Sequence, residues 1–263
     1  MELGLRGKRA VVAGASRGLG LGVARALAAE GCELAVCARG QEALKQAAEA
    51  IEQECGVKVV WRVVDLARRG AGQEFGQWAE AELGGVDIVV TNSGGPPPGR
   101  FEELDEQAWR EAVEGLLLGA QGIVRAVMGG MKQRGWGRVI NLTSITVKQP
   151  LPGLIISNAL RAAVVGWAKT LADELGPYGI TVNNICQGWF MTERVRKLLE
   201  ARAKAAGTNP EQEAQKVLSQ IPVGRMGEPA ELGALVAFLA SPLAGYINGA
   251  SIVIDGGLCR AMS

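Results

Sequence analysis

Short runs of β-branched and other apolar residues alternate along the chain with longer segments that have a helical hydrophobic period. The short runs are nearly continuous in Val and Ile, which is the pattern of strands covered on both faces of a parallel sheet. Seven runs of this kind predict strands at residues 9–14, 33–38, 58–64, 86–91, 137–143, 180–186 and 251–255.

The segments between these runs predict helices, and the longest of them cover residues 105–134 and 152–175. A repeated β-α alternation requires right-handed crossovers, with helices on both faces of the sheet. The sequence therefore predicts a doubly wound, Rossmann-type α/β fold. Its seven-stranded parallel sheet forms the middle of three layers, with helices on either side (αβα). Because the strands follow one another in a single continuous alternation, we expect residues 1–263 to form one domain.

The segment from about residue 190 to 226 departs from this pattern. It is polar and helical, and Gly207, Pro210 and Pro222 interrupt it. An insertion at the carboxyl edge of a parallel sheet is where a lid over the site is expected. A solvated pair of surface helices fits the same pattern.

Composition narrows the classes of partner. The chain has 28 basic and 27 acidic residues, so its formal net charge is +1, and we expect neither nucleic acid nor a membrane as a partner. It has no histidine, which excludes histidine-dependent triads and the common histidine-bearing zinc sites. Five cysteines without a CxxC pair predict a reduced, cytoplasmic protein without a metal site.

Residues 13–20, AGASRGLG, lie between the first predicted strand and the helix that follows it. The spacing of Gly14, Gly18 and Gly20 permits a tight turn and a close approach of the backbone to a pyrophosphate. The free N–H groups and the dipole of the following helix then favour the anion. The loop therefore predicts a dinucleotide site, and a purely structural turn is the alternative.

The end of the second strand selects the cofactor. An acidic residue there would bind the ribose 2′-hydroxyl of NAD, but this chain has Ala38 and Arg39. Arg17, from the glycine loop, can lie beside Arg39 and enclose a 2′-phosphate between two guanidinium groups. This favours NADP(H) over NAD(H), with two solvated arginines as the alternative.

Over its whole length the chain resembles the short-chain dehydrogenase/reductase family, and within it the 3-oxoacyl-carrier-protein reductases. AGASRGLG is similar to the family's glycine motif, and Asn92-Ser93-Gly94 to its Asn-Asn-Ala-Gly motif. GITVNNI (179–185), the segment 222–241 and NGASIVIDGG (248–257) resemble further signatures. The resemblance implies a Rossmann-type sheet and cofactor contacts from Gly14, Ser16, Arg17, Gly18, Leu19, Gly20, Arg39, Asp65, Leu66, Asn92, Ser93, Gly94, Arg161, Gly188 and Thr192.

The resemblance also implies a catalytic set of Ser, Tyr, Lys and Asn. Ser144 matches the family Ser, whereas Ser157 falls on the Tyr position and Arg161 on the Lys position. Leu116 falls on the Asn position. The catalytic candidates are therefore Ser144, Ser157 and Arg161, in a tetrad that has lost its Tyr, Lys and Asn.

These replacements weaken the expected proton path. A serine hydroxyl is a far weaker acid than a phenol of pKa near 10, and general acid catalysis commonly contributes about 10² to 10⁴ in rate. Arg161 keeps the positive charge, but an ordinary arginine pKa is too high for a proton relay, and Leu116 cannot hold a water. Lys148 and Gln187 are the local polar candidates for a substitute, although a lysine at such a position is more often simply exposed to solvent.

Three functions remain open at this point. The first is an NADPH-dependent carbonyl reductase acting on a small-molecule or acyl-type substrate, and the second is an NADP(H)-binding sensor, scaffold or partner subunit without redox turnover. The third is a different reaction in the same cleft. The resemblance implies a homodimer or homotetramer built on the two long helices, where Leu117, Val164 and Trp167 would suit such packing or would face the core.

Overall fold

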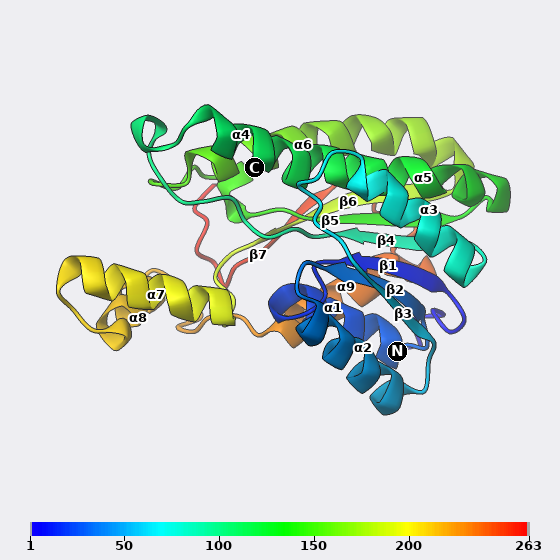
Figure 1. Cartoon of the computed structure of the whole chain (residues 1–263), viewed down its shortest axis with the longest axis horizontal. Coiled ribbons are helices and arrows are strands. Elements are labelled where there is room, and N and C mark those ends of the chain that lie inside the picture. Colours follow the sequence, from blue (N-terminus) through cyan, green and yellow to red (C-terminus); the bar gives the residue numbers. More distant parts are fainter. Residues whose placement is uncertain (1, 262–263) are drawn as a thin grey trace.

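The structure, a computed structural model, describes residues 2–261 and places the seven predicted strands in one parallel sheet (Figure 1). The strand order is β3-β2-β1-β4-β5-β6-β7, which confirms the predicted doubly wound α/β fold. The strands are β1 (Arg9–Ala13), β2 (Glu33–Ala38), β3 (Val59–Val63), β4 (Ile88–Thr91), β5 (Gly137–Leu142), β6 (Ile180–Gln187) and β7 (Ser251–Ile254).

Helices cover both faces of the sheet, as Figure 1 shows. One face carries α1 (Gly18–Ala29), α2 (Gln41–Cys55) and α9 (Pro229–Ala240), and the other carries α3 (Ala71–Leu83), α5 (Gly119–Arg134) and α6 (Ile155–Leu175). Successive strand residues point to opposite faces, so Val12 packs in one core and Val11 in the other. This burial on both faces is why the central strands are largely apolar.

The predicted helix at 105–134 forms as α4 (Glu106–Ala112), a π-helical segment (Val113–Leu118) and α5. By length and composition this continuous helix could cross a membrane. Ile123, Val127 and Met131, however, lie fully buried in the core against the sheet. It is therefore a core helix of a soluble fold.

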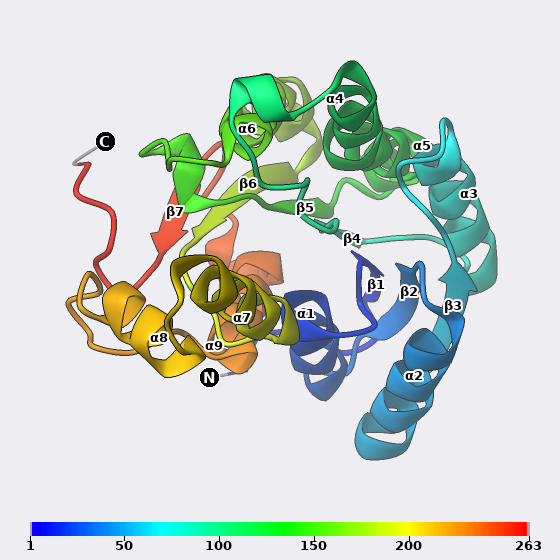
Figure 2. The same cartoon turned by 60° about the vertical axis from the view of Figure 1, so that its left-hand side comes forward.

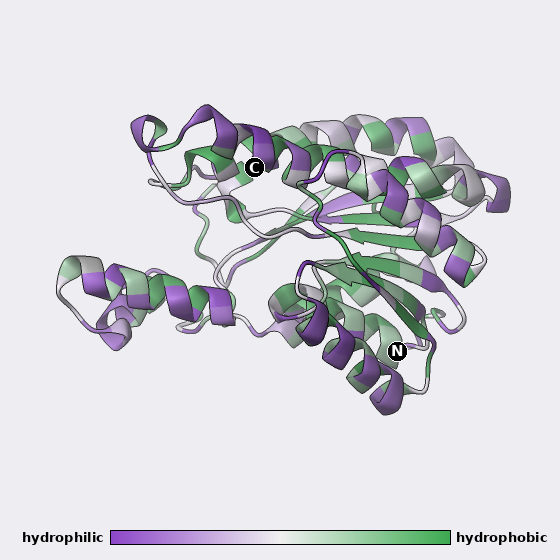
Figure 3. Ribbon diagram, in the orientation of Figure 1, coloured by the Kyte–Doolittle hydropathy of each residue, from purple (hydrophilic) through white to green (hydrophobic). Residues whose placement is uncertain are grey.

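The segment that interrupts the β-α alternation forms two helices, α7 (Glu193–Ala206) and α8 (Pro210–Leu218). They extend away from the sheet in Figure 1 and come forward in the turned view of Figure 2. Thr192 caps the start of α7, and Gly207, with φ of 65°, ends it. A small apolar cluster that includes Leu199 and Val217 holds the pair together. Hydrophilic and hydrophobic residues alternate along both helices of the pair (Figure 3).

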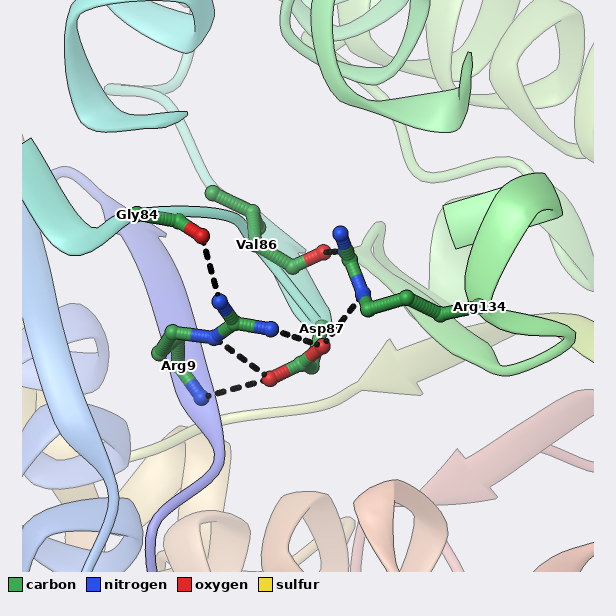
Figure 4. A network of polar contacts seen from close by, with 5 residues as sticks. All are labelled: Arg9, Gly84, Val86, Asp87 and Arg134. Carbon is green, nitrogen blue, oxygen red and sulfur yellow. Dashed lines mark hydrogen bonds and ion pairs between the residues drawn. The ribbon is translucent and has the colours of Figure 1, made fainter. Parts of the chain in front are cut away.

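A charged network joins β1, β4 and α5 near the amino ends of the strands (Figure 4). Arg9 donates to Asp87 from its backbone N–H at 3.1 Å and from Nε and Nη2 at 2.9 Å each, and Arg134 Nε donates at 3.0 Å. Burial alone would raise the pKa of Asp87, but hydrogen bonds and charges from the two arginines outweigh it and lower the pKa. The network lies at the edge opposite the predicted site and serves the fold.

The sequence left open whether apolar residues of the two long helices contact a second copy of the chain or face the core, and the structure decides this for Val164. Val164 is only 3% exposed and faces the core, so it is not available for contact with a second copy. Leu117 and Trp167 are half-buried.

Candidate active site

The carboxyl ends of β1 and β4 mark the point at which the strand order reverses direction. Crossovers on the two sides of this point leave toward opposite faces, which opens a crevice for a ligand. A cleft of about 310 Å³ lies here. Nine of the predicted cofactor residues line it, namely Gly14, Ser16, Arg17, Arg39, Asp65, Leu66, Asn92, Ser93 and Gly94.

The glycine loop has the geometry that an anion site requires. Gly14 and Gly18 have φ of 65° and 57°, a region in which side chains are strained. A Cβ added to Gly20 would lie 2.2 Å from the Gly14 carbonyl oxygen, so only glycine permits this approach of helix to loop. Helix α1 begins at Gly18 without a side-chain cap and without an acidic residue in its first turn. Its first N–H groups are thus left for an anion, and the residues present fit a dinucleotide pyrophosphate.

Two of the predicted cofactor residues, Asn92 and Leu19, also make contacts within the fold. Asn92 Nδ2 donates to the Gly14 carbonyl oxygen at 3.4 Å and ties the end of β4 to the glycine loop. The half-buried Leu19 side chain packs against the core beside α1.

Gly188 and Thr192 lie on the side of the site formed by the chain after β6. Gly188 packs against Asp255, and a Cβ added to Gly18 would lie 3.4 Å from Thr192 Cγ2. The start of α7 therefore meets the start of α1 across the site.

The two arginines predicted to enclose a 2′-phosphate lie in the same cleft but do not form a fork in this structure. Arg17 Nη1 donates to Glu193 Oε2 at 3.0 Å, and the Arg39 guanidinium lies beside Gly94. The sequence did not indicate the Arg17–Glu193 pair, because the two residues are 176 positions apart.

The three catalytic candidates lie just after β5 (Ser144) and on α6 (Ser157 and Arg161). Ser144 follows β5, and its Oγ accepts a hydrogen bond from the Thr146 N–H at 3.1 Å. Ser157 lies in the first turn of α6, and both serines are half-buried. Arg161 lies one turn further along and is 8% exposed. Its Nη1 donates to the Leu142 carbonyl oxygen at 2.6 Å, whereas its Nε is buried without a partner.

Burial, together with the like charge of Arg194, lowers the pKa of Arg161 to about 10. This is the ordinary value for a tyrosine phenol. At this pKa the guanidinium still carries its charge at neutral pH, so burial does not turn Arg161 into a proton relay.

A small cavity of about 10 Å³ lies beside Arg161 and is lined by Asn92, Ser93 and Leu116, among others. A cavity of this size holds about one water. Leu116, in the π-helical segment, packs against Ile156 and Leu160 and closes this side with hydrocarbon.

The two polar candidates for a substitute role face the carboxyl end of β6. Gln187 Nε2 donates to the Thr143 carbonyl oxygen at 2.8 Å, and its Oε1 is buried without a partner. Lys148 is half-buried in the loop after Ser144. Burial raises the pKa of Cys186, and a hydrogen bond from Thr143 and the charge of Lys148 partly offset this effect.

Comparison with known proteins agrees with this geometry. The family model described as "Enoyl-(Acyl carrier protein) reductase" matches residues 14–259. The chain is 35% identical to the D-beta-hydroxybutyrate dehydrogenase of Cupriavidus necator over 260 residues, 96% of this chain and 98% of that protein. It is 36% identical to the acetoacetyl-CoA reductase of Rhizobium meliloti over 249 residues, 94% and 97% of the two chains.

Among solved structures, the L-sorbose reductase of Gluconobacter frateurii in complex with NADPH and L-sorbose superposes with a TM-score of 0.95. The sequence identity is 32%, and the match covers 100% of both chains. Matches of this extent cover the glycine loop, the sheet and the segment with α7 and α8. The chain therefore belongs to the short-chain dehydrogenase/reductase family and is similar to its NAD(P)-dependent ketoreductases and dehydrogenases.

Proposed function

We propose that this protein is an NADP(H)-dependent carbonyl reductase whose active site works without the family's Tyr, Lys and Asn. The observation that carries the proposal is the cleft beside the uncapped start of α1, where Arg17 and Arg39 both lie. The acidic residue that would favour NAD(H) is absent from the end of β2, where Ala38 and Arg39 stand instead.

When bound, NADP(H) would supply a hydride for transfer to a carbonyl carbon. Ser144, just after the carboxyl end of β5, would donate a hydrogen bond to the carbonyl oxygen. Arg161 provides a fixed positive charge beneath the same site, with Nε free to donate a hydrogen bond to a water or a hydroxyl. Neither residue combines the acid strength of the family's Tyr phenol with its position beside the carbonyl oxygen. Because a good proton donor is therefore missing, we expect slow turnover.

The substrate class follows from the relatives. The three proteins compared above are named for hydroxybutyrate, acetoacetyl-CoA and L-sorbose, which are small hydroxy or carbonyl compounds or acyl thioesters. We propose a substrate of this kind, a small ketone or a β-ketoacyl compound, with residues 190–226 acting as a lid over it.

One observation favours a second candidate, an NADP(H)-binding protein without redox turnover. Leu116 fills its position with hydrocarbon packed against Ile156 and Leu160, which leaves no polar path on that side of Arg161. In this case the cofactor cleft would be retained while the chemistry is lost.

Thermal unfolding with each cofactor tests the first step. NADPH at 100-fold its dissociation constant should stabilise the fold by about 2.7 kcal/mol, and NADH at the same concentration by less. If neither cofactor shifts the melting temperature, both candidates fail. If NADPH binds, oxidation of NADPH in the presence of β-keto esters, ketoses and quinones supports the reductase, and a flat absorbance trace with all of them supports the binding protein.

A further inference from the structure

Arg194 lies in the first turn of α7 and reaches across the cleft to the loop after β4. Its Nη2 donates to the Pro96 carbonyl oxygen at 3.5 Å. A Cβ added to Gly95 would lie 2.3 Å from Nη2 and 2.6 Å from Cζ, so the guanidinium packs directly on Gly95. Because Arg39 lies beside Gly94, the two guanidinium groups occupy neighbouring places along one loop.

Arg194 is exposed to solvent, but it lies in an unfavourable place for a cation that has no counter-charge. The amino end of α7 carries the positive end of its helix dipole, which favours anions. Partial desolvation and the Arg39 charge lower the pKa of Arg194, and the Arg194 charge in turn lowers that of Arg161. Within residues 2–261, none of these three arginines forms an ion pair with a carboxylate.

The neighbouring residue, Glu193, places its own carboxylate beside Arg17, where the cofactor's 2′-phosphate is expected. Glu193 Oε2 accepts from Arg17 Nη1 at 3.0 Å, and its Oε1 lies 2.7 Å from Lys197 Nζ. The Arg17 and Glu193 side chains are 63% and 49% exposed. Ion pairs this exposed contribute little, so another anion can exchange for the carboxylate at small cost.

We propose that Arg194 is a ligand of the cofactor's phosphate groups, and that Glu193 is the internal anion which the 2′-phosphate displaces from Arg17. When NADP(H) binds, Arg194 at the start of α7 then gains a contact with phosphate, and Glu193 loses its contact with Arg17. This inference rests on the proposed function, because it requires a phosphorylated dinucleotide in the cleft.

Fluorescence titration with NADPH and with NADH tests it. Arg194→Met should raise the Kd for NADPH about 10-fold, because a charge-assisted hydrogen bond to phosphate is lost. Lys204→Met, at an exposed position near the other end of α7, is the matched control and should leave the Kd unchanged. A rise for both cofactors assigns Arg194 to the pyrophosphate, and a rise for NADPH alone assigns it to the 2′-phosphate.

Glu193→Gln provides the second arm. It should lower the Kd for NADPH about threefold, because the internal competitor and its repulsion of the phosphate are removed, while NADH binding stays within about 1.5-fold. Glu200→Gln, exposed on the same helix, is its control. If Arg194→Met binds NADPH as tightly as Lys204→Met does, or if Glu193→Gln weakens binding, the inference is wrong. Absence of NADPH binding by the unmodified protein would instead overturn the proposed function itself.

Discussion

The close approach of α1 to the glycine loop makes Gly20→Ala a sharp probe of the cofactor site. The added methyl would lie 2.2 Å from the Gly14 carbonyl oxygen and 2.7 Å from its carbonyl carbon. Both are backbone atoms that cannot rotate away, so helix and loop must separate by about 1 Å, and overpacking of this kind costs about 1–3 kcal/mol. The middle of this range is about 2 kcal/mol, and the better helix propensity of alanine returns about 1 kcal/mol of it, which leaves a net loss of about 1 kcal/mol.

The consequence for binding is larger than the consequence for folding. A shift of about 1 Å moves the first N–H groups of α1 away from a bound phosphate, and each charge-assisted hydrogen bond is worth about 1.5–3 kcal/mol. We expect the melting temperature to fall by about 2–4 °C and the Kd for NADPH to rise at least about 10-fold.

Differential scanning calorimetry and fluorescence titration measure the two effects. Gly166→Ala is the matched control, because Gly166 lies exposed on α6 and an added Cβ meets no atom within 4 Å. That variant should melt at or slightly above the temperature of the unmodified protein and bind NADPH equally well. If Gly20→Ala also melts normally and its Kd is unchanged, the close approach is not what requires glycine at this position.

Three further predictions concern stability and chemistry. Asp87→Asn should destabilise the fold by about 3 kcal/mol in urea at neutral pH. Since the folded pKa of Asp87 is lowered, this difference should persist above about pH 4 and fade as pH falls through the folded value, and a difference that is constant with pH would contradict the network. Arg138→Met removes a buried cation that donates to the Gly137 carbonyl oxygen at 2.7 Å and to the Gly179 carbonyl oxygen at 3.2 Å, so we expect a loss of about 2 kcal/mol in urea with an unchanged Kd for NADPH. Ser157→Tyr combined with Arg161→Lys should raise the rate of carbonyl reduction about 100-fold in a spectrophotometric assay, and an unchanged rate would refute the missing acid as the limiting factor.

The strands, their order along the chain and the glycine loop could be predicted from the sequence because each has a local signal. A buried parallel strand segment such as residues 10–13 requires an apolar run whatever lies beside it. A turn that approaches a helix as closely as Gly14 approaches Gly20 requires glycine. The nine predicted cofactor residues that line the cleft all lie at or directly after the carboxyl ends of strands, where topology alone brings them together.

The partners of the charged side chains were decided by the tertiary structure alone. No local pattern indicates that Arg17 meets Glu193 or that Arg194 packs on Gly95, because these contacts depend on the angle at which α7 leaves β6. Burial of Arg161, and with it the change in its pKa, likewise depends on the helices and loops that surround it. Hydrophobic periodicity is a property of neighbouring residues, whereas the electrostatics of a site depends on distances between segments far apart in sequence, and only the folded chain sets those distances.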